Sequence, residues 1–199
     1  GFLRRRKPLQ ASFLADTIAM VFGMPSALLP AVAAERYGDN DITKGFLYAA
    51  VPAGMLLAAF FSGWTRRVHR HGLGVVSAVS VWGVAIAAFS ITGPFWLSFL
   101  ALAVAGAGDS ISGGFRMSIL QTGTPPEMMG RLMGMGMAVW AAGPAFGDAE
   151  AGLVAELTST EISIASGGVA CVVGILILAA MWPEFRRYDI RQSRAAAAV

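Results

Sequence analysis

The chain has 199 residues, of which 56% are hydrophobic and 14% charged, and its mean hydropathy is +0.63. Soluble domains carry about 25% charged residues, so this composition excludes a soluble globular protein and predicts an integral membrane protein. The formal net charge is +3, but the basic residues lie in short loops between apolar segments, which favours anionic lipid headgroups over nucleic acid as their partner.

The first predicted membrane span covers residues 9–34 and follows a basic flank, residues 1–8, of the kind that stays in the cytoplasm. The span contains Asp16, Pro25 and Pro30. A proline removes a backbone hydrogen bond and kinks a helix, which a membrane protein tolerates where neighbouring groups bind the freed carbonyl. We expect a bend near Pro25 that suits a gate, whereas Pro30 equally well only loosens the end of the helix.

The second and third predicted spans, residues 45–64 and 73–92, contain no charged residue. The loop between them is basic, and its cations are Arg66, Arg67 and Arg70. Trp64 at the edge of this loop is typical of the membrane interface, and the cations predict a cytoplasmic location. His69 and His71 lie in the same loop with no carboxylate nearby, so we expect solvated residues rather than metal ligands.

The fourth predicted span, residues 95–121, carries two ionisable residues, Asp109 and Arg116. An ionised side chain at the centre of a membrane helix costs about 2.5–3.5 kcal/mol, so each needs a partner charge or a water-lined pathway. The two are too far apart for an i,i+4 pair, so we expect each to have a partner on another helix or in water, and Asp16 of the first span is the candidate partner of Arg116. Alternatively, Arg116 extends to the interface and Asp109 is a buried structural acceptor.

One face of this span carries its polar and small residues. Asp109, Ser112 and Arg116 follow each other at i, i+3 and i+7, which places them on the same side of a helix. Gly106 and Gly113 lie on or beside this face, and we expect them to let the helix bend.

A polar turn with the sequence TPPEMMGR leads to the fifth predicted span, residues 132–157. Thr124, Pro125 and Glu127 have the spacing of a capping box, with a hydroxyl at the N-cap, a proline at the first helical position and a carboxylate at the third. Arg131 then places a cation at the cytoplasmic mouth, where it is available to pair with an acidic helix end.

The fifth span also contains Gly143 and Pro144, which predict a kink among small residues that permit close helix approach. Asp148 and Glu150 follow, and they either border the outer interface or have a functional role. The sixth predicted span, residues 162–182, is uncharged.

The distribution of lysine and arginine predicts the orientation of these spans. Twelve lie in loops on one side of the predicted bundle, and two, Arg36 and Lys44, lie on the other. Because cytoplasmic loops carry the excess of cations, we expect both termini in the cytoplasm of a bacterial plasma membrane. The predicted organisation is a cytoplasmic flank, a six-helix bundle over residues 9–182 and a cytoplasmic tail over residues 183–199.

Three segments, AGAGDSISGGFRMSILQ, TPPEMMGR and AGPAFGDAEAG, carry a resemblance that covers residues 9–188. The chain resembles the C-terminal half of a major facilitator superfamily transporter, in particular bacterial exporters of the enterobactin-exporter and macrolide-efflux type. Two positions depart from the family patterns. Asp148 stands where the antiporter signature has a second glycine, and the loop after the second span has Arg67 where the family has an acidic residue.

The resemblance implies an all-α fold in which six membrane helices, arranged as two inverted three-helix repeats, form half of a twelve-helix transporter. In that fold the first and fourth helices line a central cavity, which here places Asp16, Asp109 and Arg116 in the cavity. The second and fifth helices form the seam with an N-terminal six-helix half, and the third and sixth face lipid. The chain begins with glycine, and we expect it to be a piece of a longer protein.

The predicted function is secondary active transport, in which proton entry drives export of a small amphipathic molecule by alternating access. Asp16 and Asp109 are the predicted proton-responsive carboxylates, and the charge of Arg116 tunes them. No cofactor or metal is predicted, and an enzyme is disfavoured because the segments contain no catalytic constellation. An uptake permease of the same superfamily and a non-transporting membrane scaffold are the alternatives.

Overall fold

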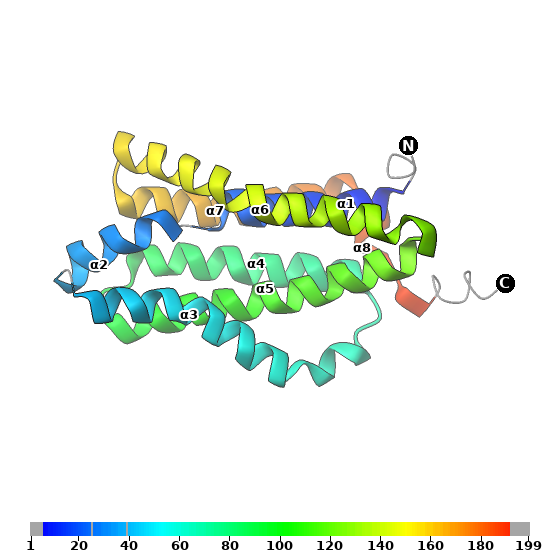
Figure 1. Ribbon diagram of the computed structural model, residues 1–199, viewed down its shortest axis with the longest axis horizontal. Helices are drawn as coiled ribbons and strands as arrows, with labels where there is room; N and C mark the ends of the chain where they lie inside the picture. Colours follow the sequence, from blue (N-terminus) through cyan, green and yellow to red (C-terminus); the bar gives the residue numbers. More distant parts are fainter. Residues whose placement is uncertain (1–5, 25, 39, 192–199) are drawn as a thin grey trace.

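The long helices run along the long axis of the molecule (Figure 1). The fold is given by a computed structural model that describes residues 6–24, 26–38 and 40–191, without the side chain of Arg66. Its helices are α1 Lys7–Phe22, η2 Ser26–Leu28, α2 Leu29–Tyr37, α3 Asp41–Phe60, η3 Ser62–Arg67, α4 His71–Ile91, α5 Phe95–Gly123, α6 Pro126–Leu157, α7 Thr160–Met181 and α8 Pro183–Arg186. The predicted all-helical class is therefore confirmed for the described residues.

Five segments of the described chain are long and apolar enough to cross a membrane. They are Lys7–Tyr37, Asp41–Phe60, His71–Ile91, Phe95–Gly123 and Thr160–Met181. Helix α6 is not among them, although its 32 residues exceed the length that a membrane requires. Glycine replaces large apolar residues along much of α6, and its outer part carries carboxylates, so its sequence is less apolar. The prediction of six spans is thus confirmed for five, and for α6 it stays a prediction.

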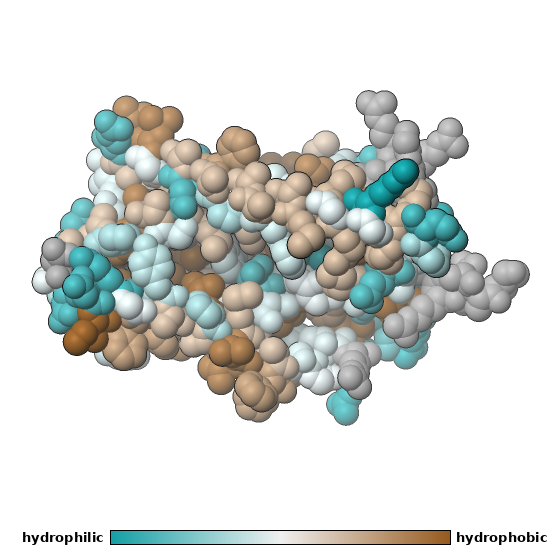
Figure 2. Space-filling model, viewed as in Figure 1, coloured by the Kyte–Doolittle hydropathy of each residue, from teal (hydrophilic) through white to brown (hydrophobic). Residues whose placement is uncertain are grey.

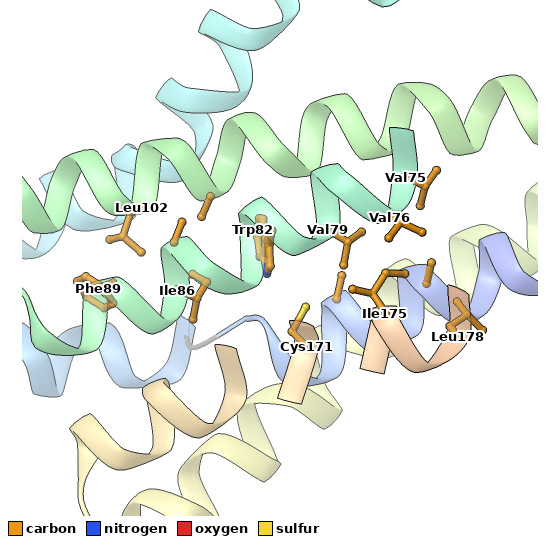
Figure 3. Close-up of a cluster of buried hydrophobic side chains, with 14 of the residues drawn as sticks. Val75, Val76, Val79, Trp82, Ile86, Phe89, Leu102, Cys171, Ile175 and Leu178 are labelled. Atoms are coloured by element: carbon orange, nitrogen blue, oxygen red, sulfur yellow. The ribbon is translucent and has the colours of Figure 1, made fainter. Parts of the chain in front are cut away.

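The helices form two groups, one of α1, α6 and α7 and one of α3, α4 and α5, which meet where α4 packs on α7 (Figure 1). Figure 3 shows this junction, in which Val79, Trp82 and Ile86 of α4 lie beside Cys171 and Ile175 of α7. All five side chains are buried. Because lipid tails are as apolar as these side chains, the junction is held mainly by close van der Waals packing.

The central position of α4 differs from the implied location of the third span against lipid. Helix α4 contacts α1, α5, α7 and α8, and only part of its surface is exposed, at residues such as Val81 and Val84. The absence of charge from this span is equally typical of a helix enclosed by other helices and of one that faces lipid. The expectation is therefore wrong for most of the surface of α4.

Helices α3 and α6 have the fewest buried residues among the long helices described. Helix α3 buries Leu47, Ala50 and Gly54, whereas α6 exposes large apolar side chains such as Met137, Trp140 and Phe146. Figure 2 shows that strongly hydrophilic residues gather at the two ends of the long axis, with apolar residues between them. The exposed sides of α3 and α6 are therefore available for a neighbouring bundle or for lipid.

Helices α3 and α5 approach each other at two glycines. A Cβ atom at Gly54 would overlap the carbonyl oxygen of Ala103, and one at Gly106 would overlap the carbonyl oxygen of Val51. These contacts are reciprocal, because each helix presents a glycine to the backbone of the other. Gly106, predicted as a bending point, is thus placed in a helix–helix contact, and α5 continues through it without a break.

The end of the molecule where α1 begins and α8 lies is called the basic end here. Lys7 forms an ion pair with Glu184 at 3.0 Å, which joins the start of α1 to α8. The backbone amide of Ile190 donates to the His69 carbonyl at 3.2 Å, and Phe185 is fully buried against Gly72. The described part of the predicted tail therefore packs against the loop between α3 and α4 and against the start of α4.

The position of His71 differs from the prediction of a solvated loop residue. Helix α4 begins at His71, and the imidazole is buried with its ring centroid 5.1 Å from that of Phe115. The prediction is wrong because the helix starts earlier than the hydropathy pattern indicates, which turns this side chain toward α5.

Candidate functional site

Asp16, Asp109 and Arg116 form one buried charge cluster. The Arg116 Nη1 group donates a hydrogen bond to Asp16 Oδ1, and Arg116 Nη2 lies 3.5 Å from Asp109 Oδ1. The side chains of Arg116 and Asp16 are each 9% exposed, and that of Asp109 is 18% exposed. The predicted pairing of Asp16 with Arg116 is thus confirmed, and Arg116 does not extend to the interface.

The contact between Arg116 and Asp109 was not expected from their seven-residue spacing. Helical side chains tilt toward the N-terminus of their helix, so the long arginine side chain reaches back toward Asp109, nearly two turns earlier. The expectation of a partner on another helix or in water is therefore confirmed for Arg116, which pairs with Asp16, and wrong for Asp109, whose partner lies on its own helix. One guanidinium, with five N–H donors in a planar fork, serves both carboxylates.

The charges within the cluster do not balance. One guanidinium faces two carboxylates, so the fully ionised cluster carries one net negative charge in surroundings that disfavour it. Binding of one proton to either carboxylate makes the cluster neutral. The arrangement is therefore chemically suited to take up and release a single proton.

The cluster borders a small pocket between α1, α5 and α6, of about 80 Å³. Its lining consists of Ser12, Phe13, Asp16, Gly113, Arg116, Met117, Leu120, Met133, Gly136, Met137 and Trp140. A Cβ atom at Gly113 would lie 3.7 Å from Arg116 Nη2, so the glycine leaves space beside the guanidinium. Drug-sized ligands occupy pockets of roughly 300–1,000 Å³, so this pocket encloses only part of such a molecule.

The side of the pocket formed by α6 was missed in the sequence. Met133, Gly136, Met137 and Trp140 recur at the spacing of one helix face. Methionine is flexible and polarisable, and it adapts to ligands of different shape. The run MMGRLMGMGM was the available signal, but the sequence was interpreted there only for a cap and a kink.

The first predicted span is interrupted in the middle. Helix α1 ends at Phe22, the turn η2 begins at Ser26, and α2 begins at Leu29. Pro25 itself lies outside the described residues, between the end of α1 and the start of η2. Pro30 is in the first turn of α2, where the missing N–H of a proline costs no hydrogen bond.

The interruption is held by residues from α3 and α6. Asp148 Oδ1 accepts hydrogen bonds from the Ser26 hydroxyl at 2.7 Å and from the Ala27 amide at 2.9 Å. The Tyr48 hydroxyl donates to the Ser26 carbonyl at 3.2 Å. Asp148 therefore binds the backbone of η2, which gives it a structural role.

Two glycines allow α6 and α7 to contact the last turn of α1. A Cβ atom at Gly147 would lie 2.5 Å from the Met20 carbonyl oxygen, and one at Gly167 would lie 2.5 Å from the Phe22 carbonyl oxygen. Gly143 also packs on Met20. Helix α6 nevertheless runs through Gly143 and Pro144 without a break, so the interruption near these residues belongs to the first span.

The turn before α6 differs from the predicted capping box. Helix α6 begins at Pro126, with Pro125 as its N-cap and no side-chain cap. The Thr124 hydroxyl is buried and has no hydrogen-bond partner among the described residues. The box is wrong because the first of the two prolines takes the N-cap position and shifts the helix start by one residue. Glu127 still lies in the first turn, where a carboxylate complements the helix dipole.

The predicted loop charges do not gather at the pocket. Arg67, Arg70 and Arg131 are exposed, and among the described residues Arg131 forms no ion pair. The side chain of Arg66 lies outside the described part of the chain. A pairing of Arg131 with an acidic helix end therefore stays a prediction.

Comparison with known proteins identifies a family and a set of relatives. The family model described as Major Facilitator Superfamily matches residues 5–197. The chain is 35% identical, over 188 residues, to proteins called "Enterobactin exporter EntS" from Escherichia coli O81 (strain ED1a), Escherichia coli O1:K1 and Shigella boydii serotype 18. This match covers 90% of the chain and 44% of each relative, so the chain spans less than half of their length. No solved structure gives a significant match. The family and these relatives indicate a transporter and not an enzyme.

Proposed function

Because this chain belongs to the Major Facilitator Superfamily, we propose that it forms one half of a secondary exporter that moves a small amphipathic molecule out of the cell. The observation that carries this proposal is the cluster of Asp16, Asp109 and Arg116 beside the pocket. Buried ionisable residues are expensive in a membrane and are typically retained for transport.

The charge imbalance of the cluster supports proton coupling. When the cluster is fully ionised, Arg116 is shared between Asp16 and Asp109. Protonation of either carboxylate weakens its hold on the guanidinium, because a neutral acid attracts a cation less strongly. The link between α1 and α5 then changes with proton occupancy. Proton entry from outside drives export if this change accompanies alternating access.

The chemistry of the pocket supports an amphipathic substrate. Methionine and aromatic side chains provide an adaptable apolar wall, whereas Asp16 and Arg116 provide polar contacts. A drug or a siderophore-like molecule has this character, and the matched relatives are named as enterobactin exporters. We propose that an N-terminal six-helix half completes the cavity by packing on the exposed sides of α3 and α6.

The experiment is a flux assay on the full-length protein in proteoliposomes with an imposed pH gradient. Asp109→Asn removes one proton site and is expected to abolish pH-driven export while the protein still inserts. Asp41→Asn makes the same chemical change at an exposed position on α3 and is the matched control. Unchanged export by Asp109→Asn would remove this residue from the mechanism.

The direction of flux tests the alternatives. Substrate flow in the direction opposite to proton flow supports export. Substrate flow in the same direction as proton flow indicates an uptake permease. The absence of flux with all tested amphipathic compounds, at any gradient, favours a scaffold. The proposed location is the bacterial plasma membrane, with the basic end of the molecule in the cytoplasm.

A further inference from the structure

A second hollow lies near the basic end, between α4 and α5. It has a volume of about 470 Å³, and the loop between α3 and α4 borders one end of it. We call it the α4/α5 groove. Its long sides are formed by Leu73, Ser77, Val81, Val104, Ala107 and Ile111, and Trp64 and Arg70 line its mouth.

The α4/α5 groove is separate from the pocket beside the charge cluster. The two share no lining residue. On α5, Val104, Ala107 and Ile111 recur at the spacing of one helix face, and this face differs from that of Asp109 and Arg116. The groove is therefore not part of the proposed transport pathway.

The loop at the mouth of the groove is basic. Arg70 lines it, and Arg67 lies three residues earlier in the same loop, exposed to solvent. The tail packs on the start of α4, since a Cβ atom at Gly72 would lie 3.4 Å from the Arg186 Cα. Asp189 also reaches this loop, through a backbone bridge to Arg70, and its carboxylate accepts from the Arg191 amide. The loop of residues 64–70 at the mouth contains arginines and no acidic residue, so it is positively charged.

The dimensions of the groove fit an acyl chain better than a helix. From Leu73 to Val81 it extends about 12 Å along α4, close to the 15 Å thickness of one leaflet of hydrocarbon. Its volume then corresponds to a cross-section of about 40 Å². A helix with its side chains is about 10 Å wide and needs roughly twice that area. The mouth also has the interfacial marker of a lipid site, because Trp64 is 50% exposed beside the cations.

We propose that the α4/α5 groove binds one acyl chain of an anionic phospholipid from the leaflet at the basic end, with Arg67 and Arg70 holding the headgroup phosphate. Two features support this occupant, namely the apolar length of the groove and the positive charge at its mouth. The first turn of α4 has no side-chain cap, so the helix dipole adds positive potential at the same place.

The test is native mass spectrometry of the full-length protein titrated with phosphatidylglycerol or with phosphatidylcholine of the same acyl chains. Both lipids carry a phosphate, but the choline cation of phosphatidylcholine offsets it, so only phosphatidylglycerol has a net negative charge for the arginines to attract. We therefore expect phosphatidylglycerol to bind at about tenfold lower lipid concentration than phosphatidylcholine. Arg70→Gln should remove most of this preference. Arg131→Gln removes one cation elsewhere at the same end and should leave the preference unchanged.

A second variant tests the groove itself. Ala107→Phe fills the hollow without changing any charge and should weaken the retention of both lipids. Equal retention of the two lipids by the unaltered protein would overturn the proposal. That result is also the one expected if another helix covers the groove. An equal effect of Arg131→Gln, or full lipid retention by Ala107→Phe, would likewise overturn it. Asp109→Asn should leave the lipid bound, so failure of this proposal is distinguishable from failure of the transport mechanism.

Discussion

At the scale of single residues, the central finding is that one arginine serves two carboxylates. The sequence predicted a partnership between Arg116 and Asp16, because these are ionisable residues on two helices expected to line the same cavity. It did not predict the contact with Asp109, since residue spacing describes where a side chain starts and not how far it reaches. The long arginine side chain spans nearly two helical turns, which is farther than an i,i+4 pair.

Arg116→Lys tests whether the forked guanidinium is required. Lysine keeps the charge but has a compact ammonium that does not bridge two carboxylates with a fixed geometry. Loss of one charge-assisted hydrogen bond costs about 1.5–3 kcal/mol, so we expect pH-driven flux in proteoliposomes to fall by about tenfold or more. Wild-type flux from the lysine variant would show that charge alone is sufficient.

Asp16→Asn tests the charge count. This variant leaves Arg116 with Asp109 alone, so the remaining pair is neutral without a bound proton. We expect substrate flux to lose its dependence on the pH gradient, with any remaining flux following the substrate gradient. Flux measured with and without an imposed gradient checks this, and flux that still follows the proton gradient would contradict it.

At the scale of helices, the interruption between α1 and α2 was predicted in part. Pro25 indicated a bend in the first span, and the helix does stop on both sides of it. The residues that hold the interruption came from elsewhere, because Asp148 and Tyr48 are distant in the sequence and only the folded chain brings them to Ser26. Pro144 lies inside α6, which continues through it as one helix, so the kink predicted there stays a prediction. A proline within a membrane helix is tolerated when neighbouring helices support it.

Gly147→Val tests the close contact of α6 with the last turn of α1. A side chain at this position overlaps the Met20 carbonyl oxygen. This oxygen belongs to the backbone of α1, so relieving the overlap requires the helix itself to shift. Overpacking of this kind costs about 1–3 kcal/mol, so thermal denaturation in detergent should occur several degrees lower. Gly134→Val, on the same helix with open space around it, is the control. Equal melting temperatures for the two variants would contradict the contact.

Asp148→Ala tests the bonds that hold the interruption. The substitution leaves the half-buried Ser26 hydroxyl and the exposed Ala27 amide without their acceptor, and each lost hydrogen bond costs about 0.5–1.5 kcal/mol. We expect faster proteolysis between α1 and α2 in the purified protein. Glu156→Ala, which removes an exposed carboxylate from the same helix, should leave the cleavage rate unchanged.

At the scale of the whole molecule, composition was sufficient to predict a helical membrane protein. The relative positions of the helices were harder to predict. The uncharged third span was expected to face lipid, but other helices enclose most of α4. The pocket wall on α6 was also missed, because methionines acquire significance only when α1 and α5 are seen to face them.

Accessibility to water tests the proposed cavity in the full-length protein. Met137→Cys places a thiol in the pocket, whereas Val169→Cys places one on an exposed part of α7. The natural Cys171 is fully buried and should not react. A water-soluble maleimide is expected to label Met137→Cys much faster than Val169→Cys, which we expect to face lipid. Similar labelling rates would argue against a water-filled cavity beside α6.

The contacts of the tail bear on where motion takes place. Glu184 holds the start of α1, Phe185 lies against α4, and the Tyr188 hydroxyl shares a hydrogen bond of 2.8 Å with Thr122 at the end of α5. Helices α1, α4 and α5 therefore all contact the same short segment of the tail. We therefore expect bending at the opposite end of the bundle, where α2 is separated from α1. A fluorophore on α2 should therefore report the transport cycle, whereas one on α8 should remain nearly still.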